Sequence, residues 1–212
     1  MFNDKYGLTA AVLAGTKTQT RRIMTGVLQA IQELRVVNNV CEYKDPYTKK
    51  WYKCNSVHQP KYKVGEIVAV AQSYFDIKTS ANSYRPPIWE GYKEWHEYLN
   101  TLPDWDCAAQ HNKMFVKAEL MPHRIRIEKV RVERLQDISN EDCLAEGITT
   151  KIEGKFEVGN GYGWDTTIER LKRDTFFTPR AAYAALIDHI SGKGTWESNP
   201  WVYAFSFKLS ED

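Results

Sequence analysis

The segment that decides the fold is Gly15-Thr16-Lys17-Thr18-Gln19-Thr20-Arg21-Arg22, where a helix ends and an extended stretch begins. The apolar run before it, residues 8–14, predicts a short helix. Gly15 suits the position just after a helix, where the backbone needs a positive φ. Helical spacing of apolar residues stops beyond this glycine. We therefore expect the polar side chains of the segment to project from an exposed turn or from the start of a strand.

Lys17 and Thr20 lie three residues apart in this segment, so a tight turn would bring an ammonium group beside a hydroxyl. Such a pair can hold a phosphate group, or the amine can activate the hydroxyl as a nucleophile. Arg21 and Arg22 follow directly and add two more cations. The alternative is a solvated basic turn whose threonines hydrogen-bond to the nearby backbone.

The composition is that of an ordinary globular protein, with 212 residues, 42% of them hydrophobic and 26% charged. The net charge is only +2, so a nucleic-acid-binding surface would have to be a local one. Aromatic residues make up 13% of the chain, and their rings can either stack on bases or fill a core.

The N-terminal residues are polar and are not followed by the apolar stretch of a secretory signal. No apolar run approaches the roughly 18 residues that a membrane-spanning helix needs. We therefore expect a cytoplasmic protein that does not enter a membrane. Its cysteines are then expected to be reduced thiols; they are Cys41, Cys54, Cys107 and Cys143.

Four stretches have the pattern of strands. Residues 67–71 are short and rich in β-branched side chains, which predicts a buried strand. Residues 114–120 predict another strand. Residues 124–135 alternate between apolar and basic side chains, with one offset between Ile127 and Val130 that predicts a β-bulge. Residues 201–209 alternate with an aromatic face and predict a closing strand.

One face of the 124–135 strand is strongly basic. Its cations are Arg124, Arg126, Lys129, Arg131 and Arg134. A basic strand face is usually a solvated exterior, and it is also a candidate surface for nucleic acid. We include Arg124 and Arg126 with Lys17, Arg21 and Arg22 as candidate ligand-binding residues.

Two helices have clear start signals. Ser139 is a good N-cap for a helix that ends near Gly147, and Asp142 resembles the last residue of a capping box. Glu146 is unusual because an acid in the last turn faces the negative end of the helix dipole, at a cost of a few tenths of a kcal/mol. Such a cost can mark a carboxylate placed for function. Thr178-Pro179 starts a second helix.

Two aromatic-rich stretches interrupt this framework, at about residues 24–60 and 76–112. The first looks like an insertion or a long β-ribbon, and the second contains a candidate helix over residues 89–99. Together the elements predict a single α+β domain over residues 1–212. We expect a small curled sheet or β-barrel with short helices at its mouth.

Four motifs, in this order along the chain, resemble the ASCH domain family, whose β-barrel is similar to the RNA-binding PUA fold. The motifs are Gly15-x-Lys17-x-x-Thr20-x-Arg22, Val64-Gly65-Glu66, Leu135-Gln136-Asp137-Ile138-Ser139-x-Glu141-Asp142-x-x-x-Glu146-Gly147-Ile148, and Asn199-Pro200-Trp201-Val202. The chain looks like the longer family members found in phages and in gut Bacteroides. The resemblance does not extend to the two aromatic-rich stretches.

The resemblance implies a cleft between the Gly-x-Lys-x-x-Thr turn and the Glu-Gly helix end that binds RNA, a nucleotide or a nucleoside. One bacterial branch of the family hydrolyses the acetyl amide of acetylcytidine with a Lys, a Thr and a Glu, which fall by motif on Lys17, Thr20 and Glu146. In such an amidohydrolase Lys17 would take a proton from Thr20, and Thr20 would attack the amide carbonyl. Glu146 would protonate the leaving amine or steer water. We expect no cofactor.

A zinc site is an alternative suggested by cysteine and histidine spacing. Cys54-x-x-x-His58 and Cys107-x-x-x-His111 each place two metal ligands four residues apart. Together they would form a Cys₂His₂ site, although their spacing is not that of a standard zinc finger.

A third alternative is a phage-derived factor that binds another protein. Several tryptophans suit such a surface; they are Trp51, Trp89, Trp95 and Trp105. These tryptophans would otherwise pack the two aromatic-rich stretches onto the barrel.

Overall fold

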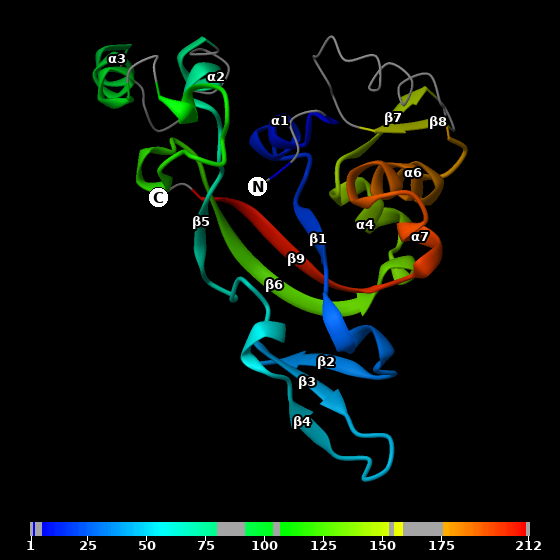
Figure 1. Ribbon diagram of the computed structural model, residues 1–212. Coiled ribbons are helices and arrows are strands. Elements are labelled where there is room, and N and C mark those ends of the chain that lie inside the picture. Colours follow the sequence, from blue (N-terminus) through cyan, green and yellow to red (C-terminus); the bar gives the residue numbers. More distant parts are fainter. Residues whose placement is uncertain are drawn as a thin grey trace.

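Two long antiparallel strands, β6 (Arg124–Arg134) and β9 (Trp201–Ser210), form the centre of the molecule in the computed structural model (Figure 1). β1 (Gln19–Ile23) pairs with β9 and β5 (Ile67–Ala69) pairs with β6, giving an antiparallel sheet in the order β1-β9-β6-β5. The sheet curls into half of a barrel with short helices around it, so the fold is mixed α+β. The structure describes residues 2, 6–79, 92–103, 107–152, 155–158 and 176–210.

The long strands are those that the alternating sequence pattern predicts. Ile125, Ile127 and Val130 of β6 are all buried, and the pairing register with β9 shifts between Ile127 and Lys129. The predicted β-bulge is therefore confirmed. It allows apolar residues on both sides of the offset to face the same core.

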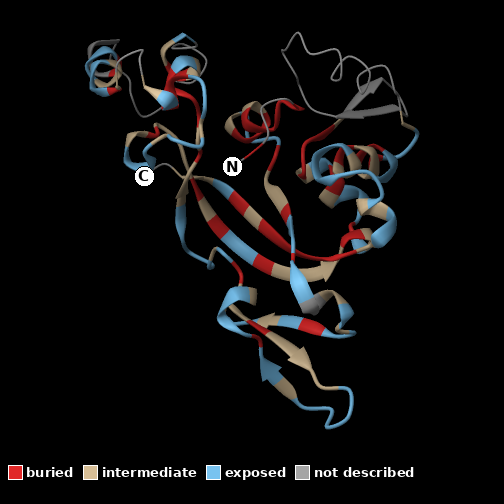
Figure 2. Ribbon diagram, in the orientation of Figure 1, coloured by how far each residue is buried: buried red, intermediate tan, exposed pale blue. Residues whose placement is uncertain are grey.

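The first half of β9, residues 201–205, is buried on both of its faces and is red in Figure 2, whereas Lys208 near its end is exposed. The predicted aromatic face includes Tyr203 and Phe205, and the opposite face contributes the equally buried Val202 and Ala204. Pairing with β1 and β6 satisfies both edges of β9, and apolar side chains of the core cluster pack on its faces. One apolar cluster joins β9 to the helices α1 (Leu8–Leu13) and α6 (Pro179–Ser191).

The helix boundaries follow the capping signals in the sequence. α4 (Asn140–Ala145) begins after Ser139, whose hydroxyl accepts a hydrogen bond from the amide of Asp142 at 3.1 Å. α6 begins after Thr178, whose hydroxyl accepts from the amide of Ala181 at 3.1 Å. Short helix α7 (Thr195–Ser198) follows α6, and the hairpin β7 (Ile148–Ile152) and β8 (Lys155–Val158) follows α4.

The first aromatic-rich stretch forms a separate antiparallel sheet, which confirms the expected β-ribbon. Its strands are β2 (Leu34–Val37), β3 (Val40–Lys44) and β4 (Trp51–Lys53), flanked by 3-10 helices Gly26–Ala30 and Ser56–His58. The ribbon extends away from the curled sheet on the side opposite α1 (Figure 1). The guanidinium of Arg35 stacks on Trp51, 4.1 Å from the centre of the ring. This tryptophan therefore has a partner within the ribbon.

The described part of the second aromatic-rich stretch forms a small core of its own. α2 (Tyr74–Thr79), α3 (Tyr92–Thr101) and the 3-10 helix Ala108–Gln110 surround it. Trp95 is buried in this cluster beside Tyr74, so it packs the stretch together and is not part of a partner surface. Trp89 and Trp105 lie outside the described residues.

Two predicted strands differ from the structure. Residues 114–120 form a turn and the 3-10 helix Ala118–Leu120, with Met114 and Phe115 exposed. β5 is a strand, but it lies at the edge of the sheet with Ile67 exposed, so the prediction of a buried strand is wrong. β5 has a paired strand on one side only. Residues 114–120 pair with no strand in the described structure. No helix in the described ranges is long and apolar enough to cross a membrane.

Candidate functional site

The backbone turns inward between α1 and β1. The amides of Thr16 and Lys17 both donate to the carbonyl of Ala11, at 3.0 and 2.9 Å, and the amide of Thr18 donates to the carbonyl of Ala145 at 2.8 Å. These bonds hold the segment between the end of α1 and the end of α4. Lys17 is therefore only 2% exposed, and the expectation of an exposed turn is wrong for this residue.

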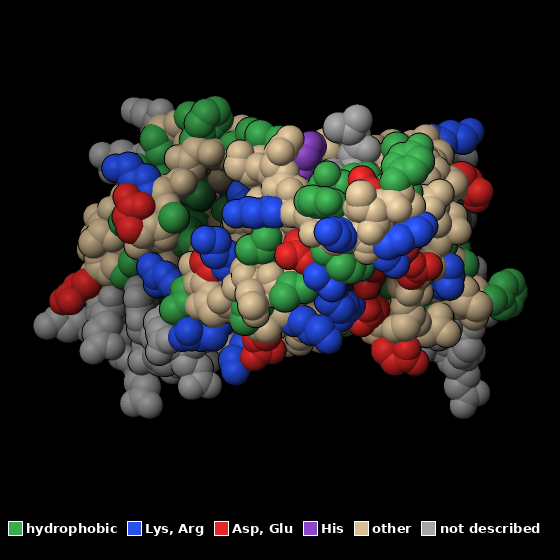
Figure 3. Space-filling view, turned by 90° about the horizontal axis from the view of Figure 1, so that it is seen from below, with side chains coloured by type: hydrophobic (Ala, Val, Ile, Leu, Met, Phe, Trp, Pro, Cys, Tyr) green, Lys and Arg blue, Asp and Glu red, His purple; other side chains and the backbone are tan. Residues whose placement is uncertain are grey.

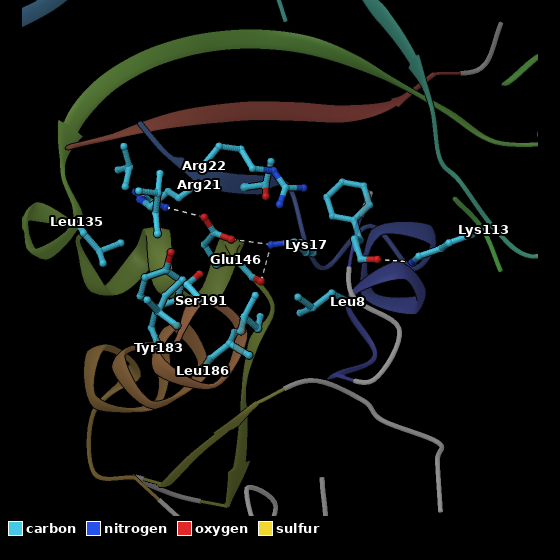
Figure 4. Close-up of a pocket in the computed structure, with 16 residues that line it drawn as sticks. Leu8, Lys17, Arg21, Arg22, Lys113, Leu135, Glu146, Tyr183, Leu186 and Ser191 are labelled. Atoms are coloured by element: carbon cyan, nitrogen blue, oxygen red, sulfur yellow. Dashed lines mark hydrogen bonds and ion pairs between the residues drawn. The ribbon is translucent and has the colours of Figure 1, made fainter. Parts of the chain in front are cut away.

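Lys17 and Glu146 form a buried ion pair. The Lys17 Nζ lies 2.6 Å from Glu146 Oε2 and also donates to the Glu146 carbonyl oxygen at 2.7 Å (Figure 4). Carbonyls in the last turn of a helix have no partner within the helix. The ammonium group satisfies one of them and neutralises the carboxylate at the negative end of the dipole. This explains why an acid is tolerated at the end of α4.

Arg21 connects the same carboxylate to the sheet. Its Nη1 donates to Glu146 at 3.0 Å, its Nη2 to Asp142 at 2.7 Å and its Nε to Glu133 at 2.8 Å. Burial acts against the charge of the guanidinium, but the charges of Glu146 and Glu133 raise the pKa of Arg21 above its usual value. One side chain thus joins β1, α4 and β6.

Asp142 is a member of the site that sequence reasoning assigned to a different role. Its carboxylate accepts hydrogen bonds from Gln19 at 2.7 Å and from Arg131 at 2.6 Å, besides the bond from Arg21. Burial favours its neutral form, but these donors hold the pKa of Asp142 below its usual range. Only the Ser139 half of the predicted capping box forms, because the carboxylate binds partners distant in the sequence.

The cluster is balanced in charge, and half of its members are buried while Glu133, Asp142 and Arg131 are partly exposed. Its three carboxylates, Glu133, Asp142 and Glu146, face three cations, Lys17, Arg21 and Arg131. Burial lowers the pKa of Lys17, the carboxylate of Glu146 opposes this, and the charges of Arg22 and Arg21 add to the lowering. A buried amine with a lowered pKa is typical of functional sites, although structural ion pairs produce it as well.

A cavity of about 590 Å³ opens beside this cluster, within the usual range for small-molecule sites. Its polar lining includes all three predicted catalytic residues and both predicted arginines of the turn (Figure 4); these are Lys17, Thr20, Arg21, Arg22 and Glu146. Its apolar lining comes mainly from α6, with Leu8 as the contribution of α1. Thr20 is half-buried and lines the cavity, so a ligand bound there can contact it.

Arg124 and Arg126 are not brought to this cavity. Arg124 pairs with Ser210, whereas Arg21 lies opposite Ala204. These two positions are six residues apart on β9, or about 20 Å. Arg131 is the residue of the basic strand that reaches the cluster. Lys and Arg side chains on the face shown in Figure 3 are interspersed with Asp and Glu, as on a solvated exterior.

Tyr183 of α6 lines the same cavity and was not singled out by the sequence. Its ring packs edge-on against Trp196, with the ring centres 6.3 Å apart. Its hydroxyl is buried and has no hydrogen-bond partner among the residues that the structure describes. Burial and the nearby carboxylate of Glu146 raise the pKa of Tyr183 well above its usual value. The apolar spacing of α6 made this tyrosine look like an ordinary core residue.

Gly147 permits the close packing of Leu8 against the end of α4, beside Lys17. Its φ is +100°, and a Cβ at this position would lie 3.3 Å from Leu8 and 3.7 Å from Lys17. We expect Gly147→Ala to lower the free energy of unfolding by more than the roughly 1–3 kcal/mol of backbone strain alone. Urea denaturation measures the loss.

Gly192→Ala is a matched control for this prediction. Gly192 has a similar φ of +105°, and a Cβ there would meet no atom within 4 Å. It therefore carries the backbone strain without the crowding. Equal losses of stability in the two variants would contradict a packing role for Gly147.

The proposed zinc ligands do not form a group. The Sγ of Cys54 lies 3.6 Å from that of Cys41, and the ring of His111 packs on Phe75 with the centres 4.8 Å apart. Within the described part of the chain, no three His, Cys, Asp or Glu side chains are placed to hold a metal ion.

The chain was compared with models of known protein families, with curated proteins and with solved structures, and no match was found in any of the three comparisons.

Proposed function

We propose that this chain is a PUA-like protein of the ASCH type that binds a nucleotide or nucleoside, free or within RNA, in the cavity beside Lys17. The observation that carries the proposal is the contact between Lys17 and Glu146. These residues are 129 positions apart, yet their side chains meet at 2.6 Å, at the edge of a cavity. The resemblance to the family implies a cleft between these same two motifs.

The charges at the cavity favour a ligand with few negative charges. The cations of the buried cluster are matched by carboxylates. The basic residues that line the cavity outside the cluster are Arg22 and Lys113. Apolar side chains of α1 and α6 would cover a base, and the hydroxyl of Thr20 would bind its polar edge. RNA would therefore insert a single nucleotide into this cavity.

Titration calorimetry with nucleosides, nucleoside monophosphates and short RNAs at low salt tests this proposal. Ser191 is exposed and lines the cavity, so Ser191→Trp is expected to block binding without disturbing the core. Lys193→Trp places the same ring just outside the cavity and is expected to bind normally. If none of these ligands binds the wild type, or if Ser191→Trp binds as well as the control, the proposal is wrong.

Tyr183→Phe is expected to weaken ligand binding about tenfold while the fold gains stability. The substitution removes a buried hydroxyl that has no partner in the described structure. Burying such a group without a partner costs roughly 1–3 kcal/mol, so its removal stabilises the unliganded protein. Calorimetry measures the affinity and urea denaturation the stability. A loss of stability with unchanged affinity would show that Tyr183 only fills space.

Hydrolysis of an acylated nucleoside is a second candidate function. It is favoured by the lowered pKa of Lys17, which makes its neutral amine more accessible as a base. The Thr20 oxygen would attack the acyl carbon while its proton passes to that amine. Glu146 would receive that proton from Lys17 across 2.6 Å and deliver it to the departing nitrogen as the C–N bond breaks. Water would then cleave the Thr20 ester and release the acid.

A further inference from the structure

A second cavity, of about 460 Å³, shares Arg22 and Ile23 with the first. It lies between the end of β1, the segment before β5 and the strand β9. Because the two cavities have these lining residues in common, they adjoin at the end of β1. Arg22 and Ile23 thus form the boundary between the two cavities.

The lining of the second cavity differs in charge from that of the first. Its ionisable cations are Arg22 and Lys61, with His58 beside them, and none of the described residues that line it is acidic. The ammonium of Lys61 lies over the ring of Tyr62, 5.4 Å from its centre. Tyr62 is half-buried. Its ring packs edge-on against that of Phe205, with the ring centres 5.6 Å apart, and this contact fixes its orientation.

We propose that this second cavity is a subsite for the nucleotide adjacent to the one held beside Lys17. The inference rests on the function proposed above. Arg22 stands where the two cavities meet, and a guanidinium there can pair with the phosphate that links two nucleotides. A base can stack on the ring of Tyr62 when the exposed Lys61, which lies over this ring, turns aside, and Lys61 adds positive charge. The preferred ligand is then a dinucleotide or a longer single strand.

The test compares a nucleoside monophosphate with a dinucleoside monophosphate by titration calorimetry at one low salt concentration. Stacking of a base on an aromatic ring is a substantial interaction, so we expect the wild type to bind the dinucleotide about tenfold more tightly. Val57→Glu places a carboxylate in the second cavity, at a residue that is 80% exposed and so tolerates the change. This variant is expected to lose the tenfold gain and to bind the monophosphate unchanged.

Val64→Glu is the matched control, because Val64 is exposed and lines neither cavity. It is expected to keep the gain. Equal affinities of the wild type for the two ligands would overturn the subsite and leave the function of the first cavity intact, as would a gain that survives in Val57→Glu. Failure of both ligands to bind would overturn the proposed function itself.

Discussion

Replacing Arg21 with leucine is expected to lower the free energy of unfolding by about 3–5 kcal/mol, because it removes the buried cation that three carboxylates share and leaves the buried Glu146 with Lys17 alone. Arg21 binds Glu133, Asp142 and Glu146 simultaneously, and its side chain is only 1% exposed. Lys17 would still face Glu146, and Arg131 would still face Asp142 and, at 3.4 Å, Glu133, but neither cation reaches all three acids. Urea denaturation at pH 7, followed by far-ultraviolet circular dichroism, measures the loss.

Arg22→Leu provides the comparison, since Arg22 is the next residue on β1 and is exposed. Exposed substitutions usually change stability by less than about 0.5 kcal/mol. The two variants remove the same charge from the same strand. Similar losses in both would show that the buried network does not stabilise the fold.

The loss in Arg21→Leu should also shrink in acid. The folded state holds the pKa of Asp142 below its usual value, in part through Arg21. Between the lowered pKa of the folded state and the ordinary pKa of the unfolded state, Asp142 binds fewer protons in the folded protein. Its contribution to stability is therefore fully present above about pH 4. This contribution disappears as the pH falls through the lowered pKa. The wild type should then lose more stability than the variant.

If the protein is an amidohydrolase, Thr20→Val is expected to lower kcat/KM for an N-acetylated nucleoside by at least about 100-fold, since it removes the attacking oxygen. Thr20→Ser keeps a hydroxyl in the cavity and should retain most of the activity. Lys17→Met and Glu146→Gln should cause losses of about 10²–10⁴-fold, as expected for the removal of a general base or acid. Release of acetate from acetylcytidine and related nucleosides measures turnover.

The pH dependence gives an independent check on the role of Lys17. Only its neutral amine can accept the proton of Thr20, and burial lowers the pKa of this amine below that of an ordinary lysine. The rate should therefore rise with pH as Lys17 loses its proton. Turnover that is unchanged in Thr20→Val would contradict the mechanism. No turnover of any acetylated nucleoside by the wild type would leave binding as the function of the site.

The long strands and the helix starts could be predicted because their signals are local. The offset between Ile127 and Val130 places a bulge without knowledge of any partner strand. Ser139 and Thr178 cap helices whose first turns follow directly in the sequence. By contrast, the apolar run at 114–120 carries no information about whether a strand lies beside it, and none does in the described structure.

Part of the site was also predicted, but from the family resemblance and not from local structural signals alone. Lys17, Thr20 and Glu146 were found through the order of motifs in the family resemblance, and Glu146 was also conspicuous at the wrong end of a helix dipole. The burial of Lys17 could not be predicted, because the carboxylate that makes it tolerable comes from a residue 129 positions away.

The roles of the basic residues of β6 could not be predicted either, because they also depend on residues distant in the sequence. The sequence presents Arg124, Arg126 and Arg131 as equivalent members of one strand face. Only the pairing register, which sets Arg131 and Arg21 on either side of Ala204, distinguishes the one that reaches Asp142. Register depends on the partner strand and cannot be derived from the pattern of a single strand.

The position of β9 between β1 and β6 has a consequence for how the protein is made in the cell. β1 leaves the ribosome early, but its pairing partner is not complete until residue 206 has been added. At about 5–20 residues per second, roughly ten to forty seconds separate the synthesis of the two strands. During this interval Arg21 cannot be fixed in place, so a nascent chain interrupted before residue 201 would have no assembled site. The cell would therefore obtain a working pocket only from chains translated through β9.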